Sequence, residues 1–200
     1  MSDHAGPTLT TDRLTLRRWR TADREPFARL NADPEVMRYF VRPLAREDSD
    51  AFVDRIEASF DEFGYGPWAV ERRDDGAFLG FTGLLVQTFE APFTPCVEVG
   101  WRFDRFAWGH GYATEAGRAA VRFGFEDAAL GEILSWTSAR NSRSIAVMER
   151  LGMRRDPAED FDHPRVPMGN PDRRHVLYRL RRAEFDAAAG SGSPGESPGR

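Results

Sequence analysis

The chain has 200 residues, of which 40% are hydrophobic, and this length and composition suit one domain with a sizeable core. A net charge of −4 gives no general reason to expect a nucleic-acid partner. All 28 basic residues are arginine, which excludes chemistry that needs a lysine, and the single cysteine, Cys96, excludes an internal disulfide framework.

Apolar runs in the chain are short. None approaches the roughly 20 residues of a transmembrane helix, and the first residues lack the apolar core of a signal peptide. A lone cysteine is also compatible with a reducing compartment. We therefore expect a cytoplasmic protein without a membrane partner.

The first half of the chain predicts a strand, three helices and a hairpin. Its clearest helix signal places Phe52, Ile56 and Phe60 at helical spacing, and the glycine that follows Phe63 is a stop signal. In chain order, the predicted elements are a strand at 13–19, helices at 21–31, 33–39 and 46–63, and hairpin strands at 68–73 and 78–88.

The second half opens with a strand that leads through a glycine loop into a helix. Apolar and polar residues alternate from Val97 to Phe103, and apolar residues recur at helical spacing after Gly111. Asn141 suits the N-cap of a later helix that ends at Gly152. Further strands are predicted at 132–138 and 173–181. We expect one domain over 8–182 and a C-terminal extension over 183–200, disordered from about 190.

The glycine loop predicts an anion site. Gly109 and Gly111 allow a tight turn with uncovered amides, and the helix that follows adds unpaired N–H groups and a partial positive charge. The absence of lysine excludes a nucleoside-triphosphate P-loop, and Thr114 stands where a dinucleotide fingerprint needs its third glycine. A phosphate-bearing ligand of another kind is indicated.

The order of motifs resembles a known family. A strand, the loop Trp108–Ala116, a helix, a strand, Asn141-x-x-Ser144 and a helix ending in Leu-Gly-Met resemble the GNAT superfamily of acyl-CoA-dependent N-acetyltransferases. Within it, the loop is most similar to the RimJ/RimL-like branch. The resemblance implies an α/β (α+β) fold: a single GNAT-like domain with a mixed, mostly antiparallel sheet of six to seven strands, flanked by helices. Two parallel strands would splay apart to admit the cofactor.

The resemblance also implies which residues contact acetyl-CoA. Loop amides would hold the pyrophosphate, strand backbone groups would pair with the pantetheine arm, and a polar pair would lie near the thioester. Trp108, which replaces a polar residue of the family motif, is expected to contribute no hydrogen bond, and the strand is expected to bulge toward the thioester carbonyl. The implied contacts are Gly109, His110, Gly111, Tyr112, Ala113 and Thr114 in the loop, Trp101, Arg102 and Phe103 in the strand, and Asn141 with Ser144.

Catalytic roles are implied for two side chains. Glu98, upstream on the cofactor strand, is the candidate base, and a salt bridge on the solvent face is an equal alternative. Many family members use a tyrosine as acid at the position of Met148, so the candidate acid becomes Ser144; a hydroxyl that bonds only backbone or pantetheine is the alternative. Asp162 and His163 are candidate acceptor contacts or an alternative base, against the alternative of a loop fixed by its own hydrogen bonds.

The implied function is transfer of an acetyl group from acetyl-CoA to a primary amine by direct attack in a ternary complex. The acceptor would be a protein N-terminus or a small-molecule amine. The scattered histidines predict no metal site. A non-catalytic acyl-CoA-binding sensor or interaction module is the alternative, and a homodimer stays open because dimers are common among relatives.

Overall fold

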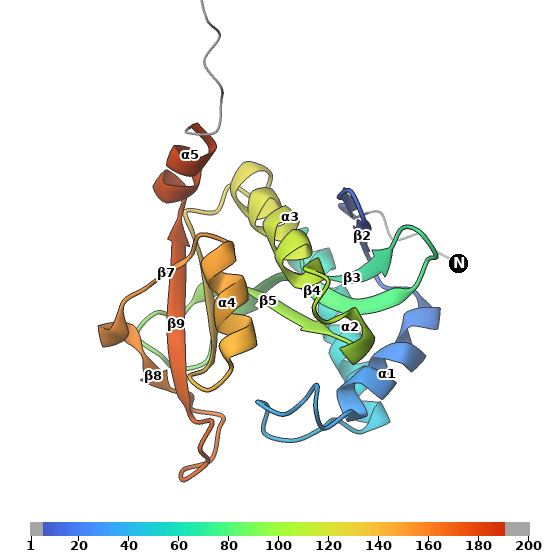
Figure 1. The fold of residues 1–200 in the computed structure, drawn as a ribbon, viewed down its shortest axis with the longest axis horizontal. Coiled ribbons are helices and arrows are strands. Elements are labelled where there is room, and N and C mark those ends of the chain that lie inside the picture. Colours follow the sequence, from blue (N-terminus) through green and yellow to red (C-terminus); the bar gives the residue numbers. More distant parts are fainter. Residues whose placement is uncertain (1–5, 191–200) are drawn as a thin grey trace, which may run out of the picture.

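The computed structural model describes residues 6–190 and arranges them as a twisted mixed sheet with helices on both faces (Figure 1). The first half contains β1 (Leu9–Thr10), β2 (Leu14–Arg17), η1 (Thr21–Asp23), α1 (Arg24–Ala32), α2 (Arg46–Phe63), β3 (Pro67–Arg72) and β4 (Phe78–Gln87). The second half contains β5 (Cys96–Phe103), η2 (Arg105–Ala107), α3 (Tyr112–Glu126), β6 (Glu132–Ser138), α4 (Ser142–Arg150), β7 (Arg154–Arg155), η3 (Pro157–Glu159), β8 (Phe161–Asp162), β9 (Arg174–Arg181) and α5 (Arg182–Gly190).

One predicted helix is wrong. Residues 33–39 form successive turns, because the Asp33 side chain accepts a hydrogen bond from the Glu35 amide at 2.8 Å and Met37 N–H closes on the Asp33 carbonyl at 3.0 Å. Such local side-chain bonding competes with a continuous helix. The segment therefore serves as the connection between α1 and α2.

The sheet confirms the predicted mixed, mostly antiparallel fold, but within residues 6–190 it has nine strands instead of six to seven. The additional strands are β1, β7 and β8, and two residues each are too few to show an alternating pattern in the sequence. Its strand order is β1-β2-β3-β4-β5-β6-β9-β7, with β8 on β9, and every pairing is antiparallel except that of β5 with β6. This parallel pair has a single rung, Glu98 opposite Leu134, so the strands part beyond Glu98. The expected bulge in β5 is absent, since its register with β4 runs without a shift from Cys96 to Phe103. The splay uncovers the strand edge without a bulge.

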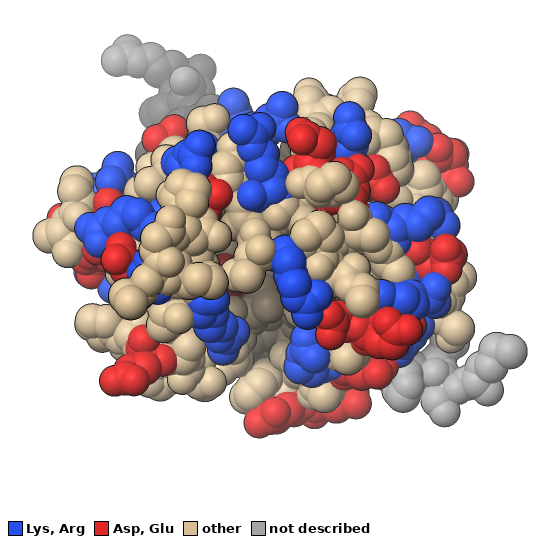
Figure 2. Space-filling view, turned by 90° about the horizontal axis from the view of Figure 1, so that it is seen from below, with Lys and Arg blue, Asp and Glu red and all other residues tan. Residues whose placement is uncertain are grey.

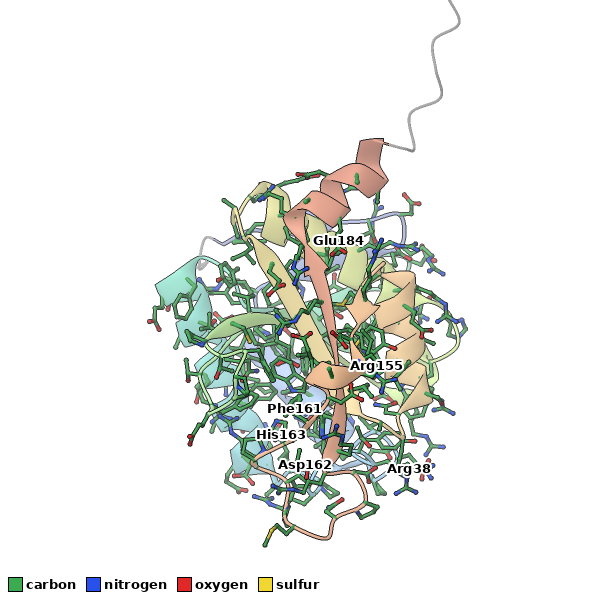
Figure 3. The ribbon with its side chains drawn as sticks, turned by 90° about the vertical axis from the view of Figure 1, so that its left-hand side faces the viewer. Arg38, Arg155, Phe161, Asp162, His163 and Glu184 are labelled. Atoms are coloured by element: carbon green, nitrogen blue, oxygen red, sulfur yellow. The ribbon has the colours of Figure 1, made fainter. Side chains whose placement is uncertain are left out.

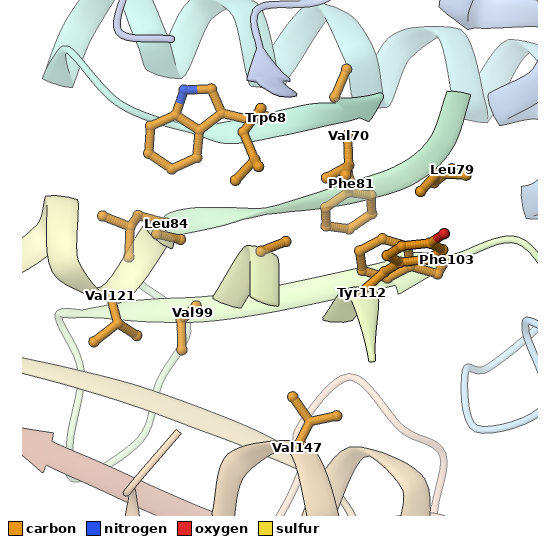
Figure 4. Close-up of a cluster of buried hydrophobic side chains, with 14 of the residues drawn as sticks. Trp68, Val70, Leu79, Phe81, Leu84, Val99, Phe103, Tyr112, Val121 and Val147 are labelled. Atoms are coloured by element: carbon orange, nitrogen blue, oxygen red, sulfur yellow. The ribbon is translucent and has the colours of Figure 1, made fainter. Parts of the chain in front are cut away.

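Successive side chains of the central strands point to opposite faces of the sheet and pack into two hydrophobic layers. Phe81 of β4 faces α1 and α2, where its ring lies 5.9 Å from Phe27 and 5.7 Å from Phe52. Leu84 points to the opposite face with Val99 and packs beneath α3 (Figure 4). Helices α3 and α4 lie on this second face, as Figure 1 shows. The two layers hold β5 rigidly on both sides of the point where it leaves β6.

Beyond β9, the helix α5 covers part of the stretch expected as a C-terminal extension. The Phe185 ring stacks on Phe125 of α3 with centroids 4.9 Å apart, which ties this helix to the core. The expected disorder concerns a tail, 191–200, that lies outside the described residues. Within 6–190, no helix combines the length and apolar character needed to cross a membrane.

Candidate active site

A long open cavity of about 2120 Å³ occupies the gap where β5 and β6 diverge. It extends from the glycine loop to the α1–α2 connection and the segment before β9, and arginine side chains flank the hollow seen from below (Figure 2). Most of the sequence-predicted residues line it: Glu98, Trp101, Arg102, Phe103, Gly109, Gly111, Tyr112, Ala113, Thr114, Asn141, Ser144 and His163. His110 and Asp162 are outside its lining.

The glycine loop adopts the conformation that an anion site needs. Gly109 and Gly111 have φ angles of 79° and 80°, in the left-handed region that favours glycine. Gly111 is the N-cap of α3 and has no side chain to occupy the first amides of the helix. His110 is exposed and its ring stacks on Tyr112 at 5.5 Å, so its side chain lies on the outer side of the loop. The first residues of α3 line the cavity, and no side chain caps their amides.

An arginine that the sequence analysis missed holds this loop in place. Arg13, beside β2, donates from Nη1 to the His110 carbonyl at 3.0 Å and from Nε to Glu115 Oε2 at 2.7 Å. Its guanidinium also lies 4.8 Å from the Tyr112 ring centroid. Partial burial would raise the pKa of Glu115, but hydrogen bonds from Thr11 and Arg13 keep that pKa below its usual value. Arg13 thus fixes both ends of the loop.

The uncovered edge of β5 lies along the cavity. Residues 100–103 pair with β4 on one side only, which leaves backbone groups of the other edge without a strand partner. Contrary to expectation, Trp108 does form a hydrogen bond: its Nε1 donates to the Phe103 carbonyl at 2.9 Å. This bond anchors the loop to the end of β5 and engages one of the predicted pantetheine contacts.

The polar pair at the start of α4 forms a closed network. Asn141 caps the helix by accepting from the Ser144 amide, and its Nδ2 donates to Thr137 Oγ1 at 2.9 Å and Ser144 Oγ at 3.1 Å. The Ser144 hydroxyl is an acceptor in this network, so its own hydrogen is the one left to donate into the cavity. Met148, at the position of the family's tyrosine, is fully buried and does not reach the cavity.

Glu98 lies where the two parallel strands part, half-buried in the wall of the cavity. Burial raises the pKa of Glu98 to about 8, and a hydrogen bond from Gln87 Nε2 to Oε2 at 2.5 Å together with the charge of Arg165 limits the rise. No carboxylate–cation pair of Glu98 occurs among the described residues, which disfavours the salt-bridge alternative. A carboxyl group with this pKa is suited to exchange protons near neutral pH.

The two acceptor-side candidates differ in environment. Asp162 is exposed and lies 3.5 Å from Arg173 Nε and 3.6 Å from Arg174 Nη1. Burial and the neighbouring His175 lower the pKa of His163 to about 4, and its Nδ1 accepts from the Arg165 amide at 3.2 Å. Figure 3 shows both residues at the same end of the molecule as Arg38. A neutral histidine with this pKa is a weaker base than Glu98.

Residues 6–190 contain no group of three or more histidine, cysteine or acidic side chains arranged to hold a metal ion. The cavity brings together the glycine loop, the start of α3 and the uncovered edge of β5.

Comparison with known proteins places this arrangement in a family. Residues 13–154 match the acetyltransferase (GNAT) domain family, and the chain belongs to it. Bacillus subtilis YkkB is 33% identical over 146 residues, which are 72% of this chain and 84% of YkkB. The FsC-acetyl coenzyme A-N(2)-transacetylase of Aspergillus fumigatus is 34% identical over 160 residues, 76% of this chain and 67% of that protein. An acetyltransferase structure from Agrobacterium tumefaciens has a TM-score of 0.71 at 28% identity, covering 90% of this chain and 98% of that one.

Proposed function

We propose that this protein transfers an acetyl group from acetyl-CoA to a primary amine, and that Glu98 is the base. The observation that carries the proposal is a carboxyl group with a pKa of about 8 at the start of an uncovered strand edge. A base is most effective when its pKa is near the working pH, because it is then both ionised in part and basic enough to accept a proton. Glu98 meets that condition, and it would accept the proton of the amine directly or through one water.

The chain's own residues fit the donor. The loop amides from Gly109 to Thr114 would hold the pyrophosphate, and the free edge of β5 would pair with the pantetheine arm. Acetyl-CoA would supply the acetyl group as a thioester, and an amide on the free edge of β5 would polarise its carbonyl. Ser144 would donate its hydroxyl hydrogen to the departing sulfur, while Asn141 keeps that hydroxyl in position.

Direct transfer is favoured over an acetylated enzyme. Burial and the nearby Glu98 raise the pKa of Cys96 to about 11, and its thiol does not line the cavity. The chain has no second cysteine and no lysine to carry the acetyl group. When the amine attacks the thioester with both substrates bound, no cysteine or lysine is needed to carry the acetyl group.

The motif at Trp108–Ala116 supports a RimJ/RimL-like placement within the family. The name of the Aspergillus fumigatus relative specifies acetyl coenzyme A and an N(2) position, which supports the same donor and a nitrogen acceptor here. A protein N-terminus and a small-molecule amine are the two acceptor classes to compare.

The experiment is a thiol-release assay with acetyl-CoA over a panel of primary amines and peptides with free N-termini. Glu98→Gln should lower kcat/KM about 100-fold or more for a good acceptor, because the amine then keeps its proton. Cys96→Ser should keep full activity, and the exposed Glu90→Gln is the matched carboxylate control. Full activity of Glu98→Gln would remove Glu98 from the mechanism.

A non-catalytic sensor is the second candidate. The buried Met148 favours it, since the position that carries a tyrosine acid in many relatives offers no proton here. A sensor would bind acetyl-CoA in calorimetry and release no thiol with any amine in the panel.

A further inference from the structure

Arg102 is a half-buried cation without an anionic partner among the described residues. Its Nη1 donates to Asn31 Oδ1 at 2.5 Å, and its guanidinium lies 4.2 Å from the Phe40 ring centroid and 5.6 Å from that of Phe81. Its Nε is buried and has no hydrogen-bond acceptor. No described carboxylate forms an ion pair with it, and burial alone lowers its pKa to about 10, so it stays charged at neutral pH.

Arg17 is more deeply buried than Arg102 and has anionic partners. Arg17 donates to both oxygens of Asp23, at 2.7 and 2.9 Å, and also pairs with Glu71. This is the usual arrangement, because a buried charge is costly unless an opposite charge or several hydrogen bonds compensate it. Arg102 lacks that compensation and keeps donors available.

Its place in the cavity shows where a partner would come from. Glu98, Gly100 and Arg102 alternate onto one face of β5, the face covered by α1 and α2, and all three line the cavity. Gly100 has no side chain, and a Cβ there would lie 3.3 Å from Leu85 Cδ1 and 3.7 Å from Glu98 Oε1. The Cα atoms of Glu98 and Arg102 are about 13 Å apart along the strand. Between Glu98 and Arg102, β5 thus presents no side chain of its own to this part of the cavity, which Leu85 of β4 also lines.

The guanidinium is also held in a fixed position. Asn31, the acceptor for Nη1, is fully buried and donates its own Nδ2 to the buried Ser49 Oγ at 2.8 Å. Phe40 covers the guanidinium from the α1–α2 connection and is itself 47% exposed, so this cover lies at the solvent side. A planar, preoriented guanidinium is the group that best recognises a carboxylate.

We propose that Arg102 binds a carboxylate of the acceptor, so that the acceptor is an amine whose own molecule carries a carboxylate at the far end of a chain lying over Gly100. This inference rests on the proposed function, because it takes the amine to lie at Glu98. The bound carboxylate accepts hydrogen bonds from the free donors of Arg102 and compensates its half-buried charge. Glu35 and Arg38 line the exposed part of the same cavity with opposite charges.

The first test is binding, which needs no turnover. The full chain saturated with coenzyme A is titrated by calorimetry with N-acetylated ω-amino acids of about eight to twelve carbons, whose extended lengths of roughly 10 to 15 Å bracket the strand distance, and with the matching carboxamides. We expect the best carboxylate to bind about tenfold or more tightly than its carboxamide, the range of a charge-assisted hydrogen bond. Equal binding of the two series at every length would overturn the proposal.

Variants identify the residue. Arg102→Gln should abolish the preference for carboxylate. Arg55→Gln is the control and should retain it, because the Arg55 guanidinium lies 5.6 Å from the Phe52 ring centroid but outside the cavity. Asn31→Asp keeps Arg102 and supplies an internal carboxylate, so it should weaken the preference as well. A preference that survives both changes would show that Arg102 is only a packing residue.

The second test is turnover of the free ω-amino acids and their carboxamides with acetyl-CoA. We expect kcat/KM to favour the carboxylates about tenfold or more in the wild type and to lose that ratio in Arg102→Gln. If binding shows the carboxylate preference and no amine is acetylated, the carboxylate subsite stands and the proposed acetyl transfer is what fails. A tenfold preference for carboxamides in either test would contradict the subsite.

Discussion

Arg13 and Glu115 join the N-terminal strands to the first turn of α3, with Arg13 Nη2 2.6 Å from Glu115 Oε2. The same guanidinium holds the His110 carbonyl, so the pair sets the shape of the glycine loop from outside. The loop amides are then preoriented before a ligand arrives, which lowers the entropic cost of binding.

Arg13→Gln should weaken acetyl-CoA binding by roughly fivefold, the equivalent of about 1 kcal/mol for a partly exposed charge-assisted bond. Calorimetry on the folded variant measures the effect. Arg73→Gln is the matched control, because Arg73 Nη1 also bonds the same N-terminal segment, at Thr11 and Asp12, without touching the glycine loop. Equal affinities for the two variants would contradict the role of Arg13.

The backbone of Gly111 gives a second test of the donor site. Gly111→Val should abolish detectable acetyl-CoA binding, because a β-branched residue at positive φ distorts the loop and covers its amides. Gly76→Val creates the same strain at a φ of 72° in the β3–β4 turn, where a Cβ meets nothing within 4 Å. Both variants should lose stability by about 1–2 kcal/mol, but only the first should lose binding. Retained binding by Gly111→Val would refute the phosphate-loop assignment.

Glu98 should make the protein less stable as the pH rises. Its pKa is about 8 in the folded state against 4.5 as the ordinary value, so between these values the folded chain keeps a proton that the unfolded chain has lost. The unfolding free energy therefore falls through this window, by up to roughly a few kcal/mol. Glu98→Gln should remove that fall in urea unfolding at pH 5.5 and 8.5, while the exposed Glu62→Gln should follow the wild type.

Gln87 is expected to lower the pKa of Glu98. Its hydrogen bond stabilises the ionised form of Glu98, so Gln87→Leu should raise the pKa of Glu98 above its value of about 8. The acidic limb of the pH–rate profile, where the rate rises as Glu98 ionises, should move to higher pH by up to about one pH unit, with acetyl-CoA affinity unchanged. A limb that stays in place or moves to lower pH would argue against Glu98 as the titrating group.

Ser144→Ala should lower kcat more than it raises the KM for acetyl-CoA. A hydroxyl that protonates the departing sulfur contributes to the transition state, whereas one that only binds pantetheine contributes to affinity. We expect a loss of about tenfold to hundredfold, at the low end for an acid because a thiolate is already a fair leaving group. Ser142→Ala, two residues earlier on the same cavity wall, is the control. An effect confined to KM would favour the binding role.

Local rules explain what could be predicted from the sequence. The alternation of apolar and polar residues predicted the strand β5. The residues around Gly111 and Asn141 predicted the starts of two helices, α3 and α4, where the structure has them. Arg13 could not be found this way, because it meets Glu115 across 102 positions of sequence and no local pattern links the two. The missing partner of Arg102 is likewise a property of packing, since a strand pattern cannot show which carboxylates reach a side chain.

The single rung between Glu98 and Leu134 divides the sheet into two half-sheets joined at one point. A ligand lying along residues 100–103 would supply the rungs that β6 leaves out, and it would thus act as a temporary strand. Amides on the free edge of β5 should then exchange with deuterium slowly only in the complex, while those paired with β4 should be slow in both states. For this chain, binding the donor would be in part the completion of its own sheet.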